Sequence, residues 1–233
     1  AKAATCTDDG YTGDIYCADC DELITKGEVV NALGHNYENG TCTNCGEIDS
    51  SYVAPEATVK ANGLNMRLQD LLKLGFYFEA SSKQEIVNVG ALLWTAEQYA
   101  QETDFTVGSK LAKHYTGLVE DGGSYSIETD GIYAQYLDTV FYFIPYVETE
   151  YGIVYGKSVS ASALTYASIA YSNTAPEKAA LRSLVIDLLN YATAARTYFC
   201  YKEGLAEPET AFNSLLSEAD RVVKWTEDMK VGA

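Results

Sequence analysis

Five of the six cysteines lie within the first 45 residues, together with one of the two histidines. Two cysteine pairs share one spacing, Cys17-Ala-Asp-Cys20 and Cys42-Thr-Asn-Cys45. A CxxC turn directs both sulfur atoms toward one point, as a tetrahedral metal ion requires. Two such turns about twenty residues apart match the ligand spacing of zinc sites. The sequence therefore predicts a structural Zn²⁺ site with protein ligands only and no position open to water.

The spacing leaves the ligand set open. One candidate set, with the more regular geometry, is Cys17, Cys20, Cys42 and Cys45. The other uses imidazole, a good metal ligand, and consists of Cys6, Cys17, Cys20 and His35. A disulfide framework is the alternative to a metal, because six is an even number of cysteines. In that case Cys200 could pair with a leftover N-terminal cysteine and clamp the two parts of the chain. A redox role is not expected, since no βαβ pattern surrounds either pair.

Residues 1–50 are predicted to form a small zinc-ribbon-like unit. Gly, Asp, Asn and small polar residues dominate this stretch, and it has few large apolar residues. A segment of this size needs a metal or a disulfide to hold it together. Short strands are expected around 13–16 and 28–33, with the two CxxC turns at the ends of a ribbon.

Two runs in this unit resemble a repeat found in large secreted and surface proteins of anaerobic Gram-positive (clostridial) gut bacteria. They read ATCTDDGYTGDIYCADC and ALGHNYENGTCTNCG, and the likeness covers residues 4–46. Asp21 stands where the repeat usually has Gly. In the repeat the residues matching Cys6, Cys17, Cys20 and His35 recur together, which brings the second ligand set close to parity with the first. The resemblance implies a secreted or cell-surface, multimodular protein.

Residues 51–233 are predicted to form a second domain that begins with strands. Apolar or alternating runs separated by Gly-containing turns are typical of a β-sandwich. Expected strands are 58–62, 73–78, 86–94, 124–129, 139–147 and 152–159, with a short helical insertion at 95–104. Pro145 suggests an edge strand or a bulge.

The last third of the chain changes to helical periodicity. A short helix is expected at 160–171, followed by a capping box from Thr174 to Glu177 and a long helix ending before Gly204. A further amphipathic helix is predicted at 208–225. The predicted fold is α+β, a β-sandwich with a C-terminal helical hairpin. Residues 57–203 resemble, in motif order and through LLNYATAARTYF near the helix end, a module of the same clostridial proteins. That resemblance supplies no catalytic motif.

No catalytic constellation stands out in the sequence. The acidic pairs Glu148/Glu150 and Glu120/Asp121 are expected by chance among 33 acidic residues. His114 is the only histidine after residue 50, and no GxSxG motif is present. Asp-Gly turns at 120–124 and 128–131 lack EF-hand spacing and are read as hairpin turns rather than calcium loops. The chain is therefore not expected to be an enzyme.

The tyrosines are the candidate contact residues. Nineteen are present, and an apolar ring with a polar tip suits a recognition surface. Strand alternation places Phe76, Phe78, Phe141 and Phe143 in the core. The candidates for an exposed recognition strip are Tyr77, Tyr142, Tyr146, Tyr151 and Tyr155.

The net charge of −17 argues against binding nucleic acid or anionic membranes. No apolar run is long enough to span a membrane, and no signal peptide is visible. The repeat-like Cys-rich unit, joined to a β-rich domain without catalytic residues, leads us to expect a non-catalytic pair of modules at the cell surface or outside the cell, as the resemblance implies. The first would be a metal-stapled spacer, and the second would contact glycans or other surface proteins in adhesion. The alternatives are a polysaccharide-active enzyme fragment and a self-associating subunit of a surface filament or layer.

Overall fold

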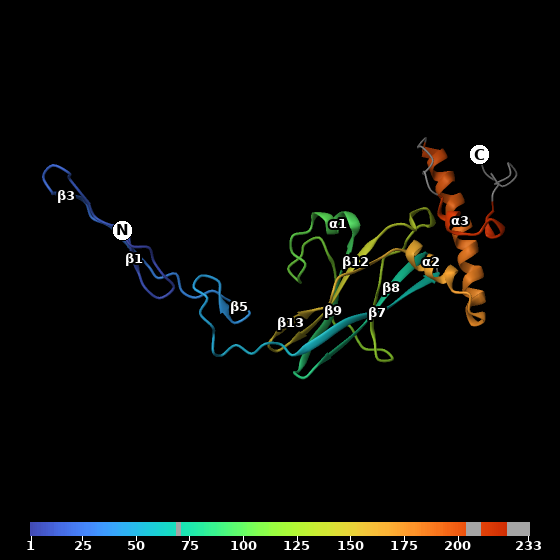
Figure 1. Ribbon diagram of the computed structural model, residues 1–233, viewed down its shortest axis with the longest axis horizontal. Coiled ribbons are helices and arrows are strands. Elements are labelled where there is room, and N and C mark those ends of the chain that lie inside the picture. The colour runs from blue at the N-terminus through green and yellow to red at the C-terminus, as the bar shows by residue number, and fades with distance from the viewer. Residues whose placement is uncertain (69–70, 204–210, 223–233) are drawn as a thin grey trace. The chain divides into compact units, whose positions relative to one another are not determined.

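The computed structural model describes residues 1–68, 71–203 and 211–222. The chain combines helices with sheets and divides into two compact units, Ala1–Pro55 and Glu56–Ala233 (Figure 1). The division falls a few residues after position 50, where the composition changes. Among the described helices, none is both long enough and apolar enough to cross a lipid bilayer.

Short antiparallel strand pairs make up the N-terminal unit. The pairs are β1 (Gly10–Tyr11) with β4 (Val29–Val30), β2 (Ile15–Tyr16) with β3 (Leu23–Thr25), and β5 (Tyr37–Glu38) with β6 (Thr41–Cys42). Its buried residues are two glycines and two cysteines, Gly10, Gly40, Cys6 and Cys42. The unit therefore has no apolar core, and its order must come from backbone pairing and from its cysteines.

Asn39 and Gly40 form the turn that joins β5 to β6. Both have positive φ, 48° and 75°. Two left-handed residues in a two-residue hairpin loop define a type I′ turn, whose twist matches that of the strands it joins. This turn fixes the register that pairs Tyr37 with Cys42.

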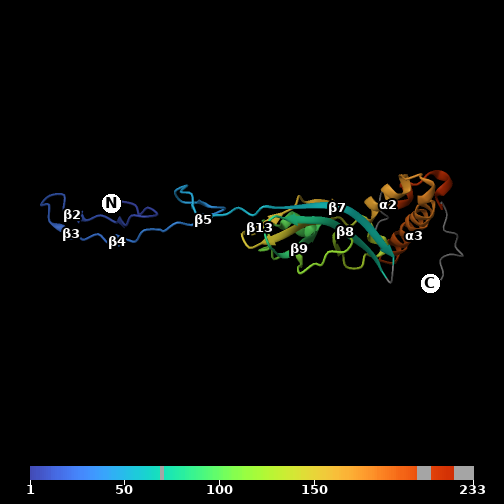
Figure 2. The same ribbon diagram turned by 90° about the horizontal axis from the view of Figure 1, so that it is seen from below.

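Two antiparallel sheets form the body of the second unit (Figures 1 and 2). The smaller has the order β11 (Tyr125–Glu128), β8 (Leu72–Ser82), β7 (Ala57–Leu68). The larger has the order β10 (Lys113–Tyr115), β9 (Ile86–Thr95), β12 (Phe141–Thr149), β13 (Gly152–Tyr155), with β14 (Val159–Ala161) also paired to β12. The sequence did not predict β10.

The two sheets share one apolar core. Phe76 and Phe78 of β8 and Phe143 of β12 are almost fully buried, as their alternation along the strands predicts. The ring of Phe143 stacks on that of Phe76 with centroids 5.0 Å apart and lies 5.7 Å from that of Phe78. These contacts join the two sheets face to face, the arrangement of a β-sandwich.

Pro145 lies inside the central strand β12 rather than on an edge strand. It is opposite Ala91 of β9 on one side. On the other side, β13 pairs as far as Tyr146 and β14 only from Phe143. The proline therefore occupies the gap between two partners, where no neighbouring strand needs the N–H that it lacks.

Helices close one end of the second unit (Figure 2). Helix α2 (Ala163–Ser172) begins at Ser162, whose Oγ accepts the backbone N–H of Thr165 at 3.0 Å, and it packs against α3 (Ala179–Glu203). The predicted capping box at Thr174 does not form. A 3₁₀ turn starting at Pro176 leads into α3 instead, with Ala175 at its N-cap.

The predicted helix at 208–225 is wrong over its described part. Residues 211–222 contain two 3₁₀ turns, Phe212–Leu215 and Glu218–Asp220, so this segment does not form a helical hairpin with α3. Phe212 and Leu216 are buried in the core. Asn190 of α3 accepts the N–H of Val222 at 3.0 Å and donates to the carbonyl of Asp220 at 2.9 Å. Hydrogen bonds to α3 thus replace those of a helix.

Candidate metal centre

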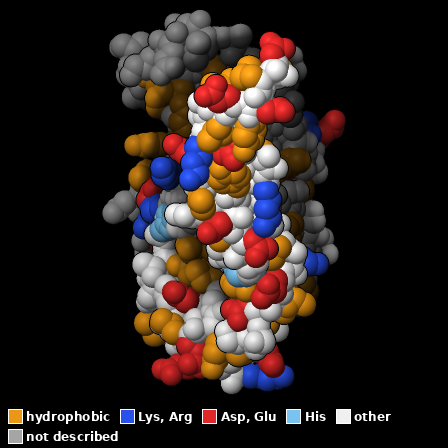
Figure 3. Space-filling view, turned by 90° about the vertical axis from the view of Figure 1, so that its left-hand side faces the viewer, with side chains coloured by type: hydrophobic (Ala, Val, Ile, Leu, Met, Phe, Trp, Pro, Cys, Tyr) orange, Lys and Arg blue, Asp and Glu red, His pale blue; other side chains and the backbone are white. Residues whose placement is uncertain are grey.

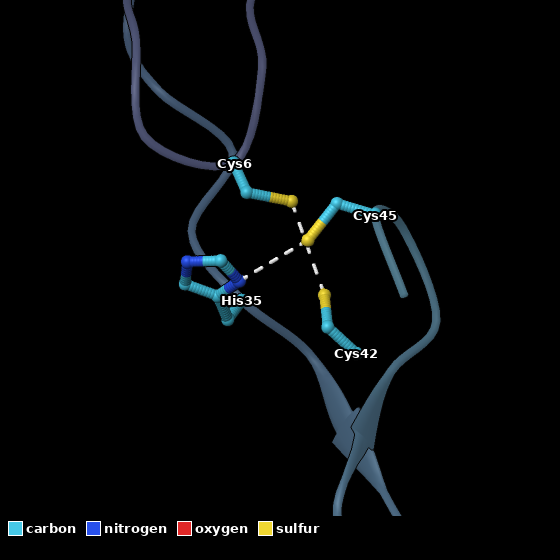
Figure 4. A group of neighbouring side chains, drawn as sticks. All are labelled: Cys6, His35, Cys42 and Cys45. Atoms are coloured by element: carbon cyan, nitrogen blue, oxygen red, sulfur yellow. Dashed lines mark hydrogen bonds between the residues drawn. The ribbon is translucent and has the colours of Figure 1, made fainter. Parts of the chain in front are cut away.

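Four side chains of the N-terminal unit converge on one point: Cys6, His35, Cys42 and Cys45 (Figure 4). Their ligand atoms all lie within 4.8 Å of one another. The Sγ atoms of Cys6 and Cys42 are 3.9 Å apart, and Sγ of Cys45 lies 3.5 Å from Nδ1 of His35. A tetrahedral zinc ion would hold sulfur atoms about 3.8 Å apart, and sulfur and nitrogen about 3.5 Å apart. The donor set and its spacing therefore fit a Cys₃His site.

Backbone pairing brings Cys6 next to His35. The N–H of Leu33 donates to the carbonyl of Thr5 at 2.9 Å, and that of Gly34 to the carbonyl of Cys6 at 3.0 Å. These two bonds continue the β1–β4 pairing toward the cluster. These backbone bonds thus place two ligands that are far apart in sequence side by side.

A tight turn supplies the other two ligands. The N–H of Cys42 donates to the carbonyl of Glu47 at 2.7 Å, and that of Gly46 donates back to the carbonyl of Cys42 at 2.8 Å. Gly46 has φ of 77°, in the left-handed region. We call this Cys42–Glu47 turn the second knuckle. It points both of its sulfur atoms into the cluster.

Glu47 orients the imidazole of His35. Nδ1 of His35 faces Cys45, whereas Nε2 lies 3.5 Å from Oε2 of Glu47. The ring also stacks on that of Tyr37, with centroids 5.4 Å apart. A carboxylate behind a metal-binding histidine fixes the tautomer and makes the ring a stronger ligand. Sequence analysis missed Glu47; its position two residues after the CxxC was the available signal.

The surroundings of the cluster shift the pKa values of two of its thiols in opposite directions. Burial raises the pKa of Cys6 to about 12, and the neighbouring thiols of Cys45 and Cys42 add to the rise. Burial also tends to raise the pKa of Cys42. Hydrogen bonds from the backbone of Cys45 and Asn44 outweigh this effect and lower the pKa to about 6. A dication among the sulfur atoms would favour the thiolate form of each.

The cluster corresponds to neither predicted ligand set. It takes Cys6 and His35 from one set and Cys42 and Cys45 from the other, and it leaves out Cys17 and Cys20. All six cysteines are free, Cys200 among them, so neither a disulfide framework nor a disulfide clamp is present. The spacing alone could not show that the 5–6 and 33–34 segments pair beside the second knuckle.

Most of the predicted tyrosine strip lies in a second apolar cluster of the sandwich. Tyr146 is buried there with Leu92, Trp94 and Ile144, and Tyr142 and Tyr155 pack against it. The ring of Tyr142 stacks on that of Tyr99 of α1 (Ala96–Gln101), with centroids 3.9 Å apart. These three rings are therefore packing residues. Tyr151 is exposed in the β12–β13 turn.

Tyr77 remains on an open sheet face. It lies on the outer side of β8, opposite the core face that carries Phe76 and Phe78, and is half-buried. Its register partners are Gly63 of β7 and Ser126 of β11. Nδ2 of Asn65 donates to its hydroxyl oxygen at 2.7 Å, which fixes the ring. Glu128, bound to Arg67 at 3.0 Å, lies on the same face.

The acidic pairs Glu148/Glu150 and Glu120/Asp121 do not show the arrangement of a catalytic pair of carboxylates. Oε2 of Glu148 accepts a hydrogen bond from Asn88 at 3.4 Å, whereas Glu150, Glu120 and Asp121 are exposed. Asp121 and Ser124 bracket a turn in which Gly122 and Gly123 have positive φ. His114 lies on β10 and contacts the carbonyl of Ser109 at 2.8 Å. Within the described ranges, Cys6, His35, Cys42 and Cys45 form the sole cluster with metal-ligand geometry.

Comparison with known proteins identifies no family for this chain. No family model and no curated protein matches it. Among solved structures, BhCBM56 shares 12% identity over 48% of this chain and 96% of its own, with a TM-score of 0.28. OgpA from Akkermansia muciniphila shares 9% identity over 53% of this chain and 34% of its own, at 0.27. A complex of inactive OgpA with an O-glycopeptide substrate scores 0.27 at 10% identity. Such low scores leave function to be argued from the site itself.

Proposed function

We propose that this chain is a non-catalytic pair of modules from a secreted or cell-surface protein, in which a structural zinc ion holds the N-terminal unit together. The observation that carries the proposal is the cluster of Cys6, His35, Cys42 and Cys45, with spacings of 3.9 and 3.5 Å between ligand atoms. Four protein ligands complete a tetrahedron and leave no position for a substrate or a reactive water.

Metal content tests the first half of this proposal. The full chain, purified under reducing conditions, is expected to contain at least about one zinc ion per chain, held by the cluster of Cys6, His35, Cys42 and Cys45. Cys42→Ser and His35→Ala should lose it, whereas Cys200→Ser, which changes a cysteine outside the cluster, should keep it. Absence of zinc, together with thiols that react only after reduction, would instead establish disulfides and overturn the proposal.

We further propose that the outer face of β7, β8 and β11 contacts neutral glycans through Tyr77. The hydrogen bond from Asn65 fixes the ring in place, and Arg67 and Glu128 offer charged hydrogen-bonding groups on the same face. A fixed aromatic ring beside such polar groups is suited to stacking on a sugar ring and bonding its hydroxyls.

A glycan array tests the second half. Tyr77→Ala should weaken binding about tenfold, corresponding to about 1.4 kcal/mol. Tyr191→Ala removes an exposed tyrosine from α3 and serves as the matched control. Unchanged binding by Tyr77→Ala would contradict the assignment of this face.

A further inference from the structure

The Cys17–Glu22 turn, which we call the first knuckle, repeats the second knuckle bond for bond. The N–H of Cys17 donates to the carbonyl of Glu22 at 2.8 Å, and that of Asp21 donates back to the carbonyl of Cys17 at 3.0 Å. The second knuckle has the same two bonds at 2.7 and 2.8 Å, between residues 25 positions later.

Both turns also have a residue with left-handed backbone conformation at the equivalent position. Asp21 has φ of 55°, and Gly46, its equivalent in the second knuckle, has φ of 77°. An aspartate rarely adopts this left-handed region, so the hydrogen bonds of the turn hold it there. The first knuckle therefore makes with Asp21 the turn that the second knuckle makes with Gly46. The first knuckle presents Cys17 and Cys20 as the second presents Cys42 and Cys45.

The two knuckles differ in the other potential metal ligands that lie near their sulfur atoms. Cys6 and His35 complete the second knuckle, but among the described residues no third His, Cys, Asp or Glu has a ligand atom close enough to join Cys17 and Cys20. Cys20 is exposed and Cys17 partly so. Both lie in the loop between β2 and β3, the two strands labelled side by side in Figure 2. The first knuckle thus has two of the four ligands that a tetrahedral ion takes.

The strands on either side of the first knuckle carry exposed apolar side chains. Ile15, Tyr16, Leu23 and Ile24 are each between 47% and 65% exposed. The unit has no core to receive them. Packing of the same hairpin from another molecule against this one would cover them and bring two further cysteines to the open side of the knuckle.

We propose that Cys17 and Cys20 form half of a second metal centre, which the same two residues of a second copy of this chain complete. Each copy contributes two thiols, which release their protons to the buffer, and a Zn²⁺ ion between the copies is held by four thiolates. The inference rests on the proposed metal function of the second knuckle. The aspartates and glutamate of the hairpin (Asp14, Asp19, Asp21, Glu22) repel another copy, so association should require the metal.

Titration of the reduced, metal-free full chain with Co²⁺, followed by absorption and sedimentation, tests the inference. The first equivalent of Co²⁺ should give the absorption spectrum of a Cys₃His site, while sedimentation still gives the mass of a monomer. About half an equivalent more should give a Cys₄ spectrum and double the mass. Failure at the first equivalent would count against the proposed function, whereas failure at the additional half equivalent would count against the second centre alone.

The variant Cys17→Ser/Cys20→Ser should bind about one ion per chain and remain monomeric, while Cys200→Ser behaves like the parent protein. Intact β-sheet circular dichroism would show that the double variant is folded. The proposal is overturned if the saturated parent protein stays monomeric, whether it then binds one ion or two, or if the double variant still dimerises with Co²⁺.

Discussion

Glu47 is expected to control metal affinity without touching the metal. It faces Nε2 of His35 at 3.5 Å and so keeps Nδ1 directed at the cluster. Removing such a partner commonly lowers affinity 10–100-fold, and because Glu47 is largely exposed we expect about tenfold for Glu47→Gln. Competition with a chelator of known affinity measures the change. Glu38→Gln, at an exposed acid of the same unit, is the control; equal affinities of the two variants would exclude an orienting role for Glu47.

Glu102 organises the loop that covers Trp94. Its carboxylate accepts from Trp94 Nε1 at 3.0 Å, from Ser109 Oγ, and from the N–H groups of Thr103 and Asp104 at 2.9 and 3.0 Å. These hydrogen bonds lower the pKa of Glu102 from 4.5 to about 2, and the bond from Ser109 contributes most. The stability contributed by the ionised carboxylate is therefore complete above about pH 4.5 and lost as the pH falls toward about 2.

Acidification from about pH 5 to about pH 2 should accordingly release the loop and shift Trp94 fluorescence to longer wavelength. In Glu102→Gln the shift should already be present at neutral pH and should change little on acidification. Both proteins should carry Trp225→Phe so that Trp94 alone reports. A parent protein with a pH-independent spectrum over this range would contradict the assigned role.

At the scale of the elements, Phe143 joins the two sheets. It is fully buried between Phe76 and Phe78 of the opposite sheet. Truncation to alanine leaves a cavity that neither sheet can fill, so Phe143→Ala should lower the free energy of unfolding by about 3–5 kcal/mol. Urea denaturation measures the loss. Phe199→Ala, at a partly exposed ring of α3, should cost far less, and equal losses would contradict the central position of Phe143.

Strand alternation and apolar runs predicted most strands of the sandwich, because these sequence patterns depend on which side chains are buried. Phe76, Phe78 and Phe143 follow this rule. The segment from 211 does not, although Phe212 and Leu216 have helical spacing, because Asn190 and Thr193 of α3 bind its backbone groups. Similarly, the CxxC spacing predicted metal-binding turns but not their partners. Backbone pairing of the 5–6 segment with Leu33 and Gly34 brings Cys6 to the second knuckle, and the spacing of the cysteines does not encode that pairing.

On the scale of the whole molecule, the two units differ in what stabilises them. The second unit has a continuous apolar core, whereas the first buries only cysteines and glycines. On the face drawn in Figure 3, acidic side chains are scattered among basic, polar and apolar ones rather than gathered in one patch. Residues 1–55 hold ten acidic residues and only two lysines, and this excess of negative charge adds repulsion within a unit that has no core to oppose it.

Chelation should therefore unfold the first unit and spare the second. Limited proteolysis with a chelator present is expected to cut within residues 1–55 and leave a fragment beginning near Glu56. The thermal transition of the sandwich should stay unchanged. Protection of the first unit despite complete removal of metal would show that its backbone pairing suffices without the ion.

The cluster also has a mechanical consequence, because a metal ion bound there would tie Cys6 to Cys45 and enclose nearly the whole first unit in one loop. With zinc bound, a force pulling on the two ends of the unit would act on the zinc–sulfur bonds instead of stretching the chain between them. Rupture would release roughly 40 residues, extending the tether by roughly 130 Å at about 3.3 Å per residue. With the metal bound this unit would be a short link, and without it the unit would be a long, extensible one.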